Sequence, residues 1–293
     1  MITIFNKEIK NSLKQLRVKL IFPDILFFIV SLFLLGLFTR VTGLINLSPE
    51  IVESELEQFV IANLGSLVSS LVVFVLAAFF IGAGLKAFKL NMILESMKGK
   101  DFKLWKAFKD SHKFYWRVVG LKILSFVVLL IGFVIAIIVY SLLRNILEYL
   151  AAILAVLIML YIVLALLLKE AALFQKNSNS LDAIKNSFKT FTKNKVLILI
   201  LLVVILIVNF AAAILNEIFT LTPGFLGTVI STFFLMIILL ISAWGNLLTF
   251  NVYKNLSNKP VRVVKKAVKK SKKKAVKKST KKTTKKTRKR KSK

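Results

Sequence analysis

The stretch VLILILLVVILIVNFAAAIL, residues 196–215, decides the fold class of this chain. Its one strongly polar residue is Asn209. A helix that crosses the hydrocarbon core of a bilayer needs about 20 predominantly apolar residues. Six such stretches occur, at about 22–44, 60–85, 118–143, 149–168, 196–216 and 226–250. We therefore predict an all-α polytopic membrane protein, with six transmembrane helices in residues 1–253 and a disordered tail in residues 254–293.

The composition supports this class and excludes several kinds of site. Of the 293 residues, 57% are apolar, and the mean hydropathy is +0.77. Cys is absent and there is one His, which excludes disulfides, thiol nucleophiles and His-rich metal clusters. The net charge of +31 is unevenly distributed. Nineteen of the 44 basic residues lie in residues 261–293, which contain no acid, so these residues need a separate explanation.

The loops between the apolar stretches alternate in charge. Basic residues predominate in 1–20, 86–117 and 169–195, whereas 45–58 and 217–225 contain acids and no base. Basic loops stay on the cytoplasmic side of a membrane. We therefore expect both termini in the cytoplasm, in the plasma membrane of a prokaryote. A soluble helical bundle would not require this alternation.

A short motif recurs before the first, third and fifth apolar stretches. Each copy has six consecutive positions: an apolar residue, then Lys, then either Asn or Asp, then Ser, then any residue, then Lys. A further apolar residue follows four positions after the Ser. The defining positions are Lys10, Ser12 and Lys14; Lys109, Ser111 and Lys113; and Lys185, Ser187 and Lys189. Apolar residues at helical spacing oppose the lysines, which is typical of amphipathic helices in the membrane interface. We predict three parallel repeats, each an interfacial helix followed by a helical hairpin.

These features resemble a broad group of prokaryotic six-span membrane domains. The resemblance rests on the Lys-x-Ser segments, on the Lys169-Glu170 step after the fourth span and on the Ala183-x-x-x-Ser187 pattern. The group includes the membrane domain attached to some glycerophosphodiester phosphodiesterases and related archaeal domains of unknown function. Over residues 1–255 the resemblance implies a six-helix membrane domain and no established activity. No phosphodiesterase barrel is present in this sequence, so that activity is not carried over.

Ionisable residues in or beside the apolar stretches are candidate functional residues, since charge is costly in lipid. They are Asp24, Arg40, Lys86, Lys122 and Glu170. All lie near a predicted interface, where we expect long side chains to reach the headgroups. Glu170 is the exception, because it can pair with a basic amphipathic segment. No Asp, Glu or His lies at the centre of a span, which disfavours a proton-coupled or ion-coupled transporter.

Polar and small residues in the spans have a structural explanation. Ser66, Ser69, Ser70, Asn63, Asn209 and Asn216 are expected to hydrogen-bond between helices rather than to line a path. The run Gly82-Ala83-Gly84 predicts a close approach of another helix. His112 has no catalytic partner in its motif, since neighbouring helical residues point about 100° apart. We find no catalytic constellation and expect no enzymatic activity, no cofactor and no metal.

The tail is predicted to bind polyanions. Its candidate binding residues are Lys265, Lys266, Lys269, Lys270, Lys272, Lys273, Lys274, Lys277, Lys278, Lys281, Lys282, Lys285, Lys286, Arg288, Lys289, Arg290, Lys291 and Lys293. Too few apolar residues are present for independent folding. In composition the tail resembles the lysine-rich tails of linker histones, which implies affinity for polyanions. No aromatic residues interleave the lysines, so base stacking and sequence readout are not expected.

Three functions remain open at this point. The first is a non-enzymatic scaffold or tether, whose cytoplasmic tail binds nucleic acid or the anionic lipid of the bilayer. The second is a small-solute permease or channel built from three hairpins. The third is a membrane-insertion factor whose tail binds the ribosome.

Overall fold

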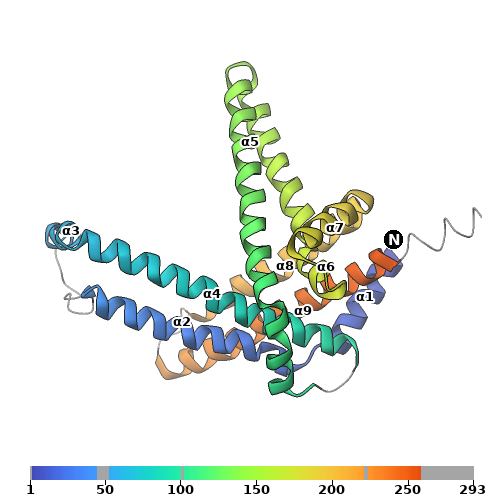
Figure 1. Ribbon diagram of the computed structural model, residues 1–293, viewed down its shortest axis with the longest axis horizontal. Helices are drawn as coiled ribbons and strands as arrows, with labels where there is room; N and C mark the ends of the chain where they lie inside the picture. The colour runs from blue at the N-terminus through green and yellow to red at the C-terminus, as the bar shows by residue number, and fades with distance from the viewer. Residues whose placement is uncertain (1, 45–52, 100–101, 221–223, 259–293) are drawn as a thin grey trace, which may run out of the picture.

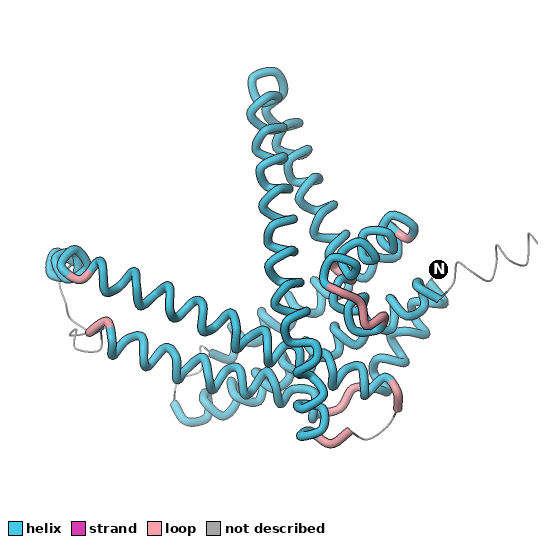
Figure 2. Tube along the Cα trace, in the orientation of Figure 1, coloured by secondary structure: helices cyan, strands magenta, loops and turns pink. Residues whose placement is uncertain are grey.

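The computed structural model describes residues 2–44, 53–99, 102–220 and 224–258. The described residues form helices joined by short connections, and no strand occurs among them (Figures 1 and 2). The helices are α1 (Ile2–Gln15), the 3-10 helix η1 (Val18–Ile21), α2 (Phe22–Val41), α3 (Glu53–Ala62), α4 (Leu64–Met97), α5 (Leu104–Leu166), α6 (Lys169–Gln175), α7 (Ser180–Lys193), α8 (Lys195–Thr220) and α9 (Gly224–Asn258).

The six predicted membrane helices are confirmed. Segments long and apolar enough to cross a membrane lie in α2, α4, α8 and α9, and α5 contains two of them. The two parts of α5 meet at Leu147, whose backbone is not helical (φ −149°, ψ 77°). The predicted ends differ at the basic side. The second apolar stretch was expected to end at residue 85, but α4 continues to Met97.

The six spans form three helical hairpins that diverge from a common base. The hairpins are α2 with α4, the two halves of α5, and α8 with α9, each pair in contact or joined directly in sequence. Figure 1 shows the first two pointing in different directions from the base. Away from the base, large apolar side chains are exposed, for example Phe33, Val73 and Phe126 at 66–67% of their surface. Such an exposed apolar surface is expected for helices surrounded by lipid tails.

The amphipathic segments differ in how they join the spans. The first and third are separate helices, α1 and α7. The second is the beginning of α5, which continues from Leu104 into the third span without a break. A further helix, α3, occurs within the acidic stretch that was expected to be only a loop.

The amphipathic segments lock the three hairpins together in a cyclic order. Each packs on the second span of the preceding hairpin: α1 on α9, the beginning of α5 on α4, and α7 on α5 and α6. A buried or half-buried hydrogen bond marks each joint. The donors and acceptors are Asn251 Nδ2 to Gln15 Oε1 at 2.8 Å, Asn91 Nδ2 to the Ala107 carbonyl at 2.9 Å, and Ser187 Oγ to the Ala165 carbonyl at 2.5 Å. This arrangement closes a ring, which we call the hub.

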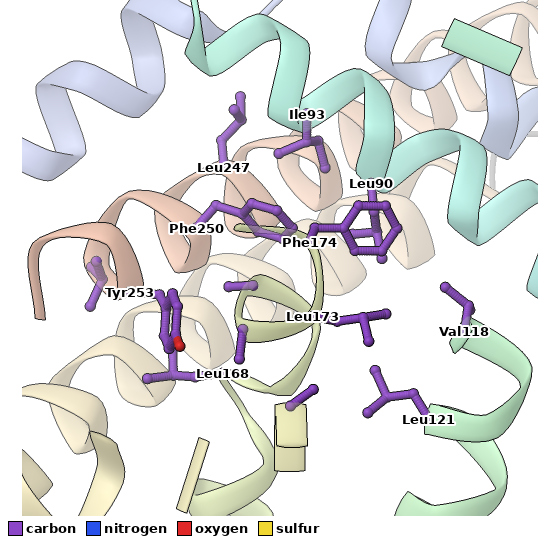
Figure 3. Close-up of a cluster of buried hydrophobic side chains, with 14 of the residues drawn as sticks. Leu90, Ile93, Val118, Leu121, Leu168, Leu173, Phe174, Leu247, Phe250 and Tyr253 are labelled. Atoms are coloured by element: carbon purple, nitrogen blue, oxygen red, sulfur yellow. The ribbon is translucent and has the colours of Figure 1, made fainter. Parts of the chain in front are cut away.

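The hub contains the main hydrophobic core. Every helix of the hub contributes buried side chains to this core, and Figure 3 shows those of α4, α5, α6 and α9. Phe174 of α6 is central, since its ring stacks on Phe114 at a centroid distance of 4.3 Å and lies 6.4 Å from the ring of Phe250. Aromatic pairs of this kind add about 0.5–1.5 kcal/mol beyond their buried area. The hub therefore holds the bases of the hairpins in fixed positions.

Candidate functional site

Six charged side chains converge where the hub meets the hairpins. They are supplied by the first turn of α2, the middle of α4, the membrane-proximal part of α5 and the start of α6. The residues are Asp24, Lys86, Lys89, Lys122, Lys169 and Glu170. Lys86 and Lys89 are three positions apart on α4, so they share one side of that helix. We call this group the lysine cluster.

Two ion pairs connect the helices of the lysine cluster. Lys86 of α4 contacts Glu170 of α6, and Lys89 Nζ lies 2.7 Å from Asp24 Oδ2 of α2. Lys89 also donates a hydrogen bond of 3.1 Å to Ser242 Oγ of α9. With 7% of its surface exposed, Lys89 depends on these partners, because a buried unpaired ammonium group is strongly unfavourable. The prediction that Glu170 pairs with an amphipathic segment is wrong, since its partner lies on α4.

The other two lysines have no carboxylate of their own. Among the described residues, neither Lys122 nor Lys169 forms an ion pair, although both are half-buried. The Lys122 ammonium lies 5.2 Å from the centroid of the Phe79 ring. This cation–π contact orients the group but does not neutralise it. Four lysines and two carboxylates leave the lysine cluster with a formal charge of +2.

Three cavities surround the lysine cluster, and residues of at least two hairpins line each of them. The Asp24 cavity (about 360 Å³) is lined by Asp24, Lys86, Lys89, Lys122, Ser242 and Asn246 among others. The lysine cavity (about 280 Å³) is lined by Lys86, Lys122, Lys169, Glu170 and Ser125 among others. The Asn209 cavity (about 380 Å³) is lined by Lys169, Glu170, Asn209, Ser242, Asn246 and Thr249 among others. Adjacent cavities share walls, so the cluster forms their common centre.

The lysine cavity is lined by both charged and apolar residues. Three ammonium groups and one carboxylate give it a formal charge of +2. The apolar lining residues include Phe79, Phe126 and Leu129. Phe126 is 66% exposed, so the apolar lining reaches the surface that faces lipid. Such a cavity can hold an anionic group beside hydrocarbon. The structure contains no cluster of three potential metal ligands in the residues that it describes.

The motif residues that the sequence singled out are divided between core and surface. Ser12, Ser111 and Ser187 are buried, whereas the six motif lysines are all exposed. Ser12 and Ser111 donate to the carbonyl three residues earlier in their own helices, at 2.8 and 2.6 Å. Ser187 instead donates to the carbonyl of Ala165 on α5. The serines are therefore packing residues of the hub, and the lysines form its charged exterior.

Other predicted residues lie apart from the lysine cluster or outside the described residues. His112 is exposed on the first part of α5. Ser69 and Asn209 donate to carbonyl groups of their own helices, and not to neighbouring spans as expected. Asn63, between α3 and α4, donates to the Phe59 carbonyl of α3. The prediction of close approach at Gly82 is confirmed, because a Cβ atom there would lie 3.2 Å from Phe27 Cε2. The polybasic tail, residues 259–293, lies outside the described residues.

Four members of the lysine cluster, Asp24, Lys86, Lys122 and Glu170, are candidates from the sequence, which does not predict that they converge. Lys89 and Lys169 lie in the basic segments 86–117 and 169–195 and are not singled out there as candidates. The available signal was the two acids at basic-side helix ends, each of which needs a cationic partner in lipid.

Comparisons of the chain with protein-family models, curated proteins and solved structures find no match. The resemblance to six-span prokaryotic domains therefore stays a prediction.

Proposed function

We propose that this protein is a non-enzymatic membrane scaffold that holds a cytoplasmic polyanion, most simply nucleic acid, beside the bilayer. One observation carries the proposal: residues 261–293 contain nineteen basic residues and no acid, and they follow directly on the last membrane helix. A chain of this charge binds nucleic acid mainly through release of counterions from the phosphates.

The position of the end of α9 supports this function. Asn251 near that end is bonded to Gln15 of α1, and the carbonyl of Gln15 accepts a hydrogen bond of 2.6 Å from Ser96 of α4. The ends of α1 and α4 therefore meet α9 at Asn251, seven residues before α9 ends. The exposed motif lysines of α1 also lie there. A polyanion bound by the tail would thus meet a second basic surface, formed by the folded part of the chain.

The charge distribution also supports a cytoplasmic position for this side. The segments that contain α1, the beginning of α5 and α7 carry most of the lysines outside the tail. By the positive-inside rule, these segments and both termini belong in the cytoplasm. In a prokaryote this places the tail within reach of the chromosome and of ribosomes.

Membrane flotation across a salt series tests the proposal. Membranes containing the full-length protein are expected to retain nucleic acid, and membranes containing a chain that ends at Pro260 are expected to release it. For about 6–10 phosphate contacts, affinity should fall by about 10³–10⁵ between 50 and 200 mM salt. Equal retention by both proteins at every salt concentration would contradict the tether.

A matched control separates charge from length. A full-length variant with its tail lysines changed to glutamine keeps the chain length and should lose retention as the truncation does. Tail-dependent binding to anionic vesicles without retention of nucleic acid would favour lipid as the tail's partner. Tail-dependent co-sedimentation with translating ribosomes would favour the insertion factor, and tail-independent solute flux in liposomes would favour the permease.

A further inference from the structure

The lysine cavity contains more positive charge than its own residues neutralise. Lys86 contacts Glu170, whereas Lys122 and Lys169 line the same cavity without a carboxylate in ion-pair contact among the described residues. All four side chains are partly buried, and they lie on segments long and apolar enough to cross a membrane. Partly buried ammonium groups without a counter-charge are unfavourable. A bound anion with up to two negative charges would balance the cavity.

The lining of the lysine cavity indicates the class of anion. Lysine is a common ligand of phosphate, to which it binds as a point charge with three N–H donors. The three ammonium groups come from α4, α5 and α6, so they approach a central anion from different helices. Phe79 and Phe126 also line the cavity and provide an apolar surface for hydrocarbon. A phosphate attached to a glycerol and acyl chains combines both properties.

The position of the lysine cavity in the fold fits the same ligand. It lies between α4 and α5, at the basic end of two hairpins whose outer parts expose apolar side chains. Basic pockets between transmembrane helices on the cytoplasmic side bind anionic headgroups in other membrane proteins. We propose that the lysine cavity is a binding site for a phosphate group, which either an anionic phospholipid or a soluble phosphate compound can supply.

This site is separate from the tail and from the proposed tether. Its residues lie in α4, α5 and α6, and none of them belongs to residues 259–293. Loss of phosphate binding in the lysine cavity would leave tail-dependent retention of nucleic acid unchanged. Each proposal can therefore fail without the other.

Thermal unfolding in nanodiscs tests the site with the full chain. One series adds phosphatidylglycerol to phosphatidylcholine discs, and a second adds inorganic phosphate to discs of phosphatidylcholine alone. The double variant K122Q/K169Q removes the two unpaired charges. The control K185Q/K189Q removes two exposed lysines of α7, so its total charge equals that of K122Q/K169Q. All proteins keep the tail, so its contribution to lipid binding cancels in the comparison.

A ligand that binds the folded state raises the Tm in a saturable way. For the wild type and for K185Q/K189Q, we expect a saturable rise of several degrees with at least one of the two probes. For K122Q/K169Q, we expect the apparent affinity to fall at least tenfold. A shift with phosphatidylglycerol alone assigns the site to a lipid headgroup, and a shift with inorganic phosphate assigns it to a soluble compound.

The Tm without ligand distinguishes binding from a structural role. In phosphatidylcholine discs free of phosphate, K122Q/K169Q should be at least as stable as the wild type, because it lacks two uncompensated charges. Lysines that only support the fold would instead give a lower Tm under every condition, which overturns the proposal. If K122Q/K169Q does not fold, the Tm of the wild type and of K122R/K169R is measured with both probes, since both proteins keep the two charges. If neither protein shows a saturable rise in Tm with either probe, the phosphate-site proposal is overturned.

Discussion

The ion pair between Lys86 and Glu170 offers a sharp test of how the lysine cluster is balanced. The substitution Glu170→Gln keeps the shape of the side chain and removes its charge. The lysine cavity then contains three ammonium groups and no carboxylate, so its formal charge changes from +2 to +3. We expect the variant to fold with a lower stability.

The size of this effect follows from the exposure of the two side chains. Removing one partner of a fully buried pair costs about 3–5 kcal/mol. The side chains of Lys86 and Glu170 are 40% and 19% exposed, so water screens part of the interaction. A loss of about 1–2 kcal/mol is therefore expected. For a folded region of this size, that loss lowers the Tm by about 2–8 °C.

A double-mutant cycle in phosphatidylcholine nanodiscs measures the pair itself. The proteins are the wild type, E170Q, K86Q and E170Q/K86Q. Since removal of Lys86 relieves the charge excess of E170Q, the double variant should be more stable than the sum of the two single effects predicts. A coupling of about 1 kcal/mol is expected, whereas contact-free residues add within about 0.3–0.5 kcal/mol. Additive effects would refute the account of a coupled cluster.

The same variant links the ion pair to the phosphate site. With a cavity charge of +3, E170Q should bind an anion more tightly than the wild type. The difference in Tm between the wild type and E170Q should therefore become smaller when the ligand is present. If lipid supplies the phosphate, this happens in discs that contain phosphatidylglycerol; if a soluble compound supplies it, this happens on addition of inorganic phosphate. A deficit that stays constant with both probes would show that the charge of Glu170 is not sensed by a ligand in the cavity.

Two further predictions concern the joints of the hub. Ser187→Ala removes the donor to the Ala165 carbonyl in the last turn of α5, where the carbonyl groups lack partners within the helix. The free energy of unfolding should fall by about 1–2 kcal/mol, as measured by thermal unfolding. Ser12→Ala removes a bond within its own helix and should lower it less. Gly120→Ala would place a Cβ atom 2.9 Å from Ser180 Oγ and should lower the Tm by a few degrees. In a Ser180→Gly background, which already lacks the bond from Ser180 Oγ to the Arg117 carbonyl, the same change should cost little; an equal loss in both backgrounds would contradict steric conflict as the cause.

The number and type of the membrane helices could be predicted because lipid leaves an apolar stretch few alternatives. A backbone in hydrocarbon must satisfy its own hydrogen bonds, so an apolar segment such as 196–215 forms a helix whatever its neighbours are. The ends at the basic side could not be predicted in the same way. α4 continues past residue 85 because Lys89 and Asn91 find partners on other helices, and hydropathy contains no information about those partners.

The lysine cluster was missed for a related physical reason. Each of its charges has an acceptable explanation when it is considered alone, because long side chains near an interface can reach the headgroups. Their convergence depends on the packing of α6 against α4, α7 and α9, which places Glu170 beside Lys86. Lys86 lies 84 residues earlier in the chain. No periodicity of the sequence encodes that contact. The acids were nevertheless informative, because a carboxylate side chain is too short to reach water from within a helix bundle.

The cyclic packing of the hub gives the lysine cavity a mechanical significance. Each hairpin is held at its base by the amphipathic segment of the next one, whereas its outer part has few protein neighbours. The lysine cavity lies at the joint between α4 and α5, so its ammonium groups belong to two different hairpins. An anion bound there contacts both hairpins at once. A ligand stabilises the arrangement that it contacts best, so occupancy of this cavity would bias the angle between the hairpins. Spin labels on the outer parts of α4 and α5 would reveal that bias, if the distances between them are measured with and without the anionic ligand. An unchanged distance distribution at saturating ligand would show that the hub is rigid at this joint.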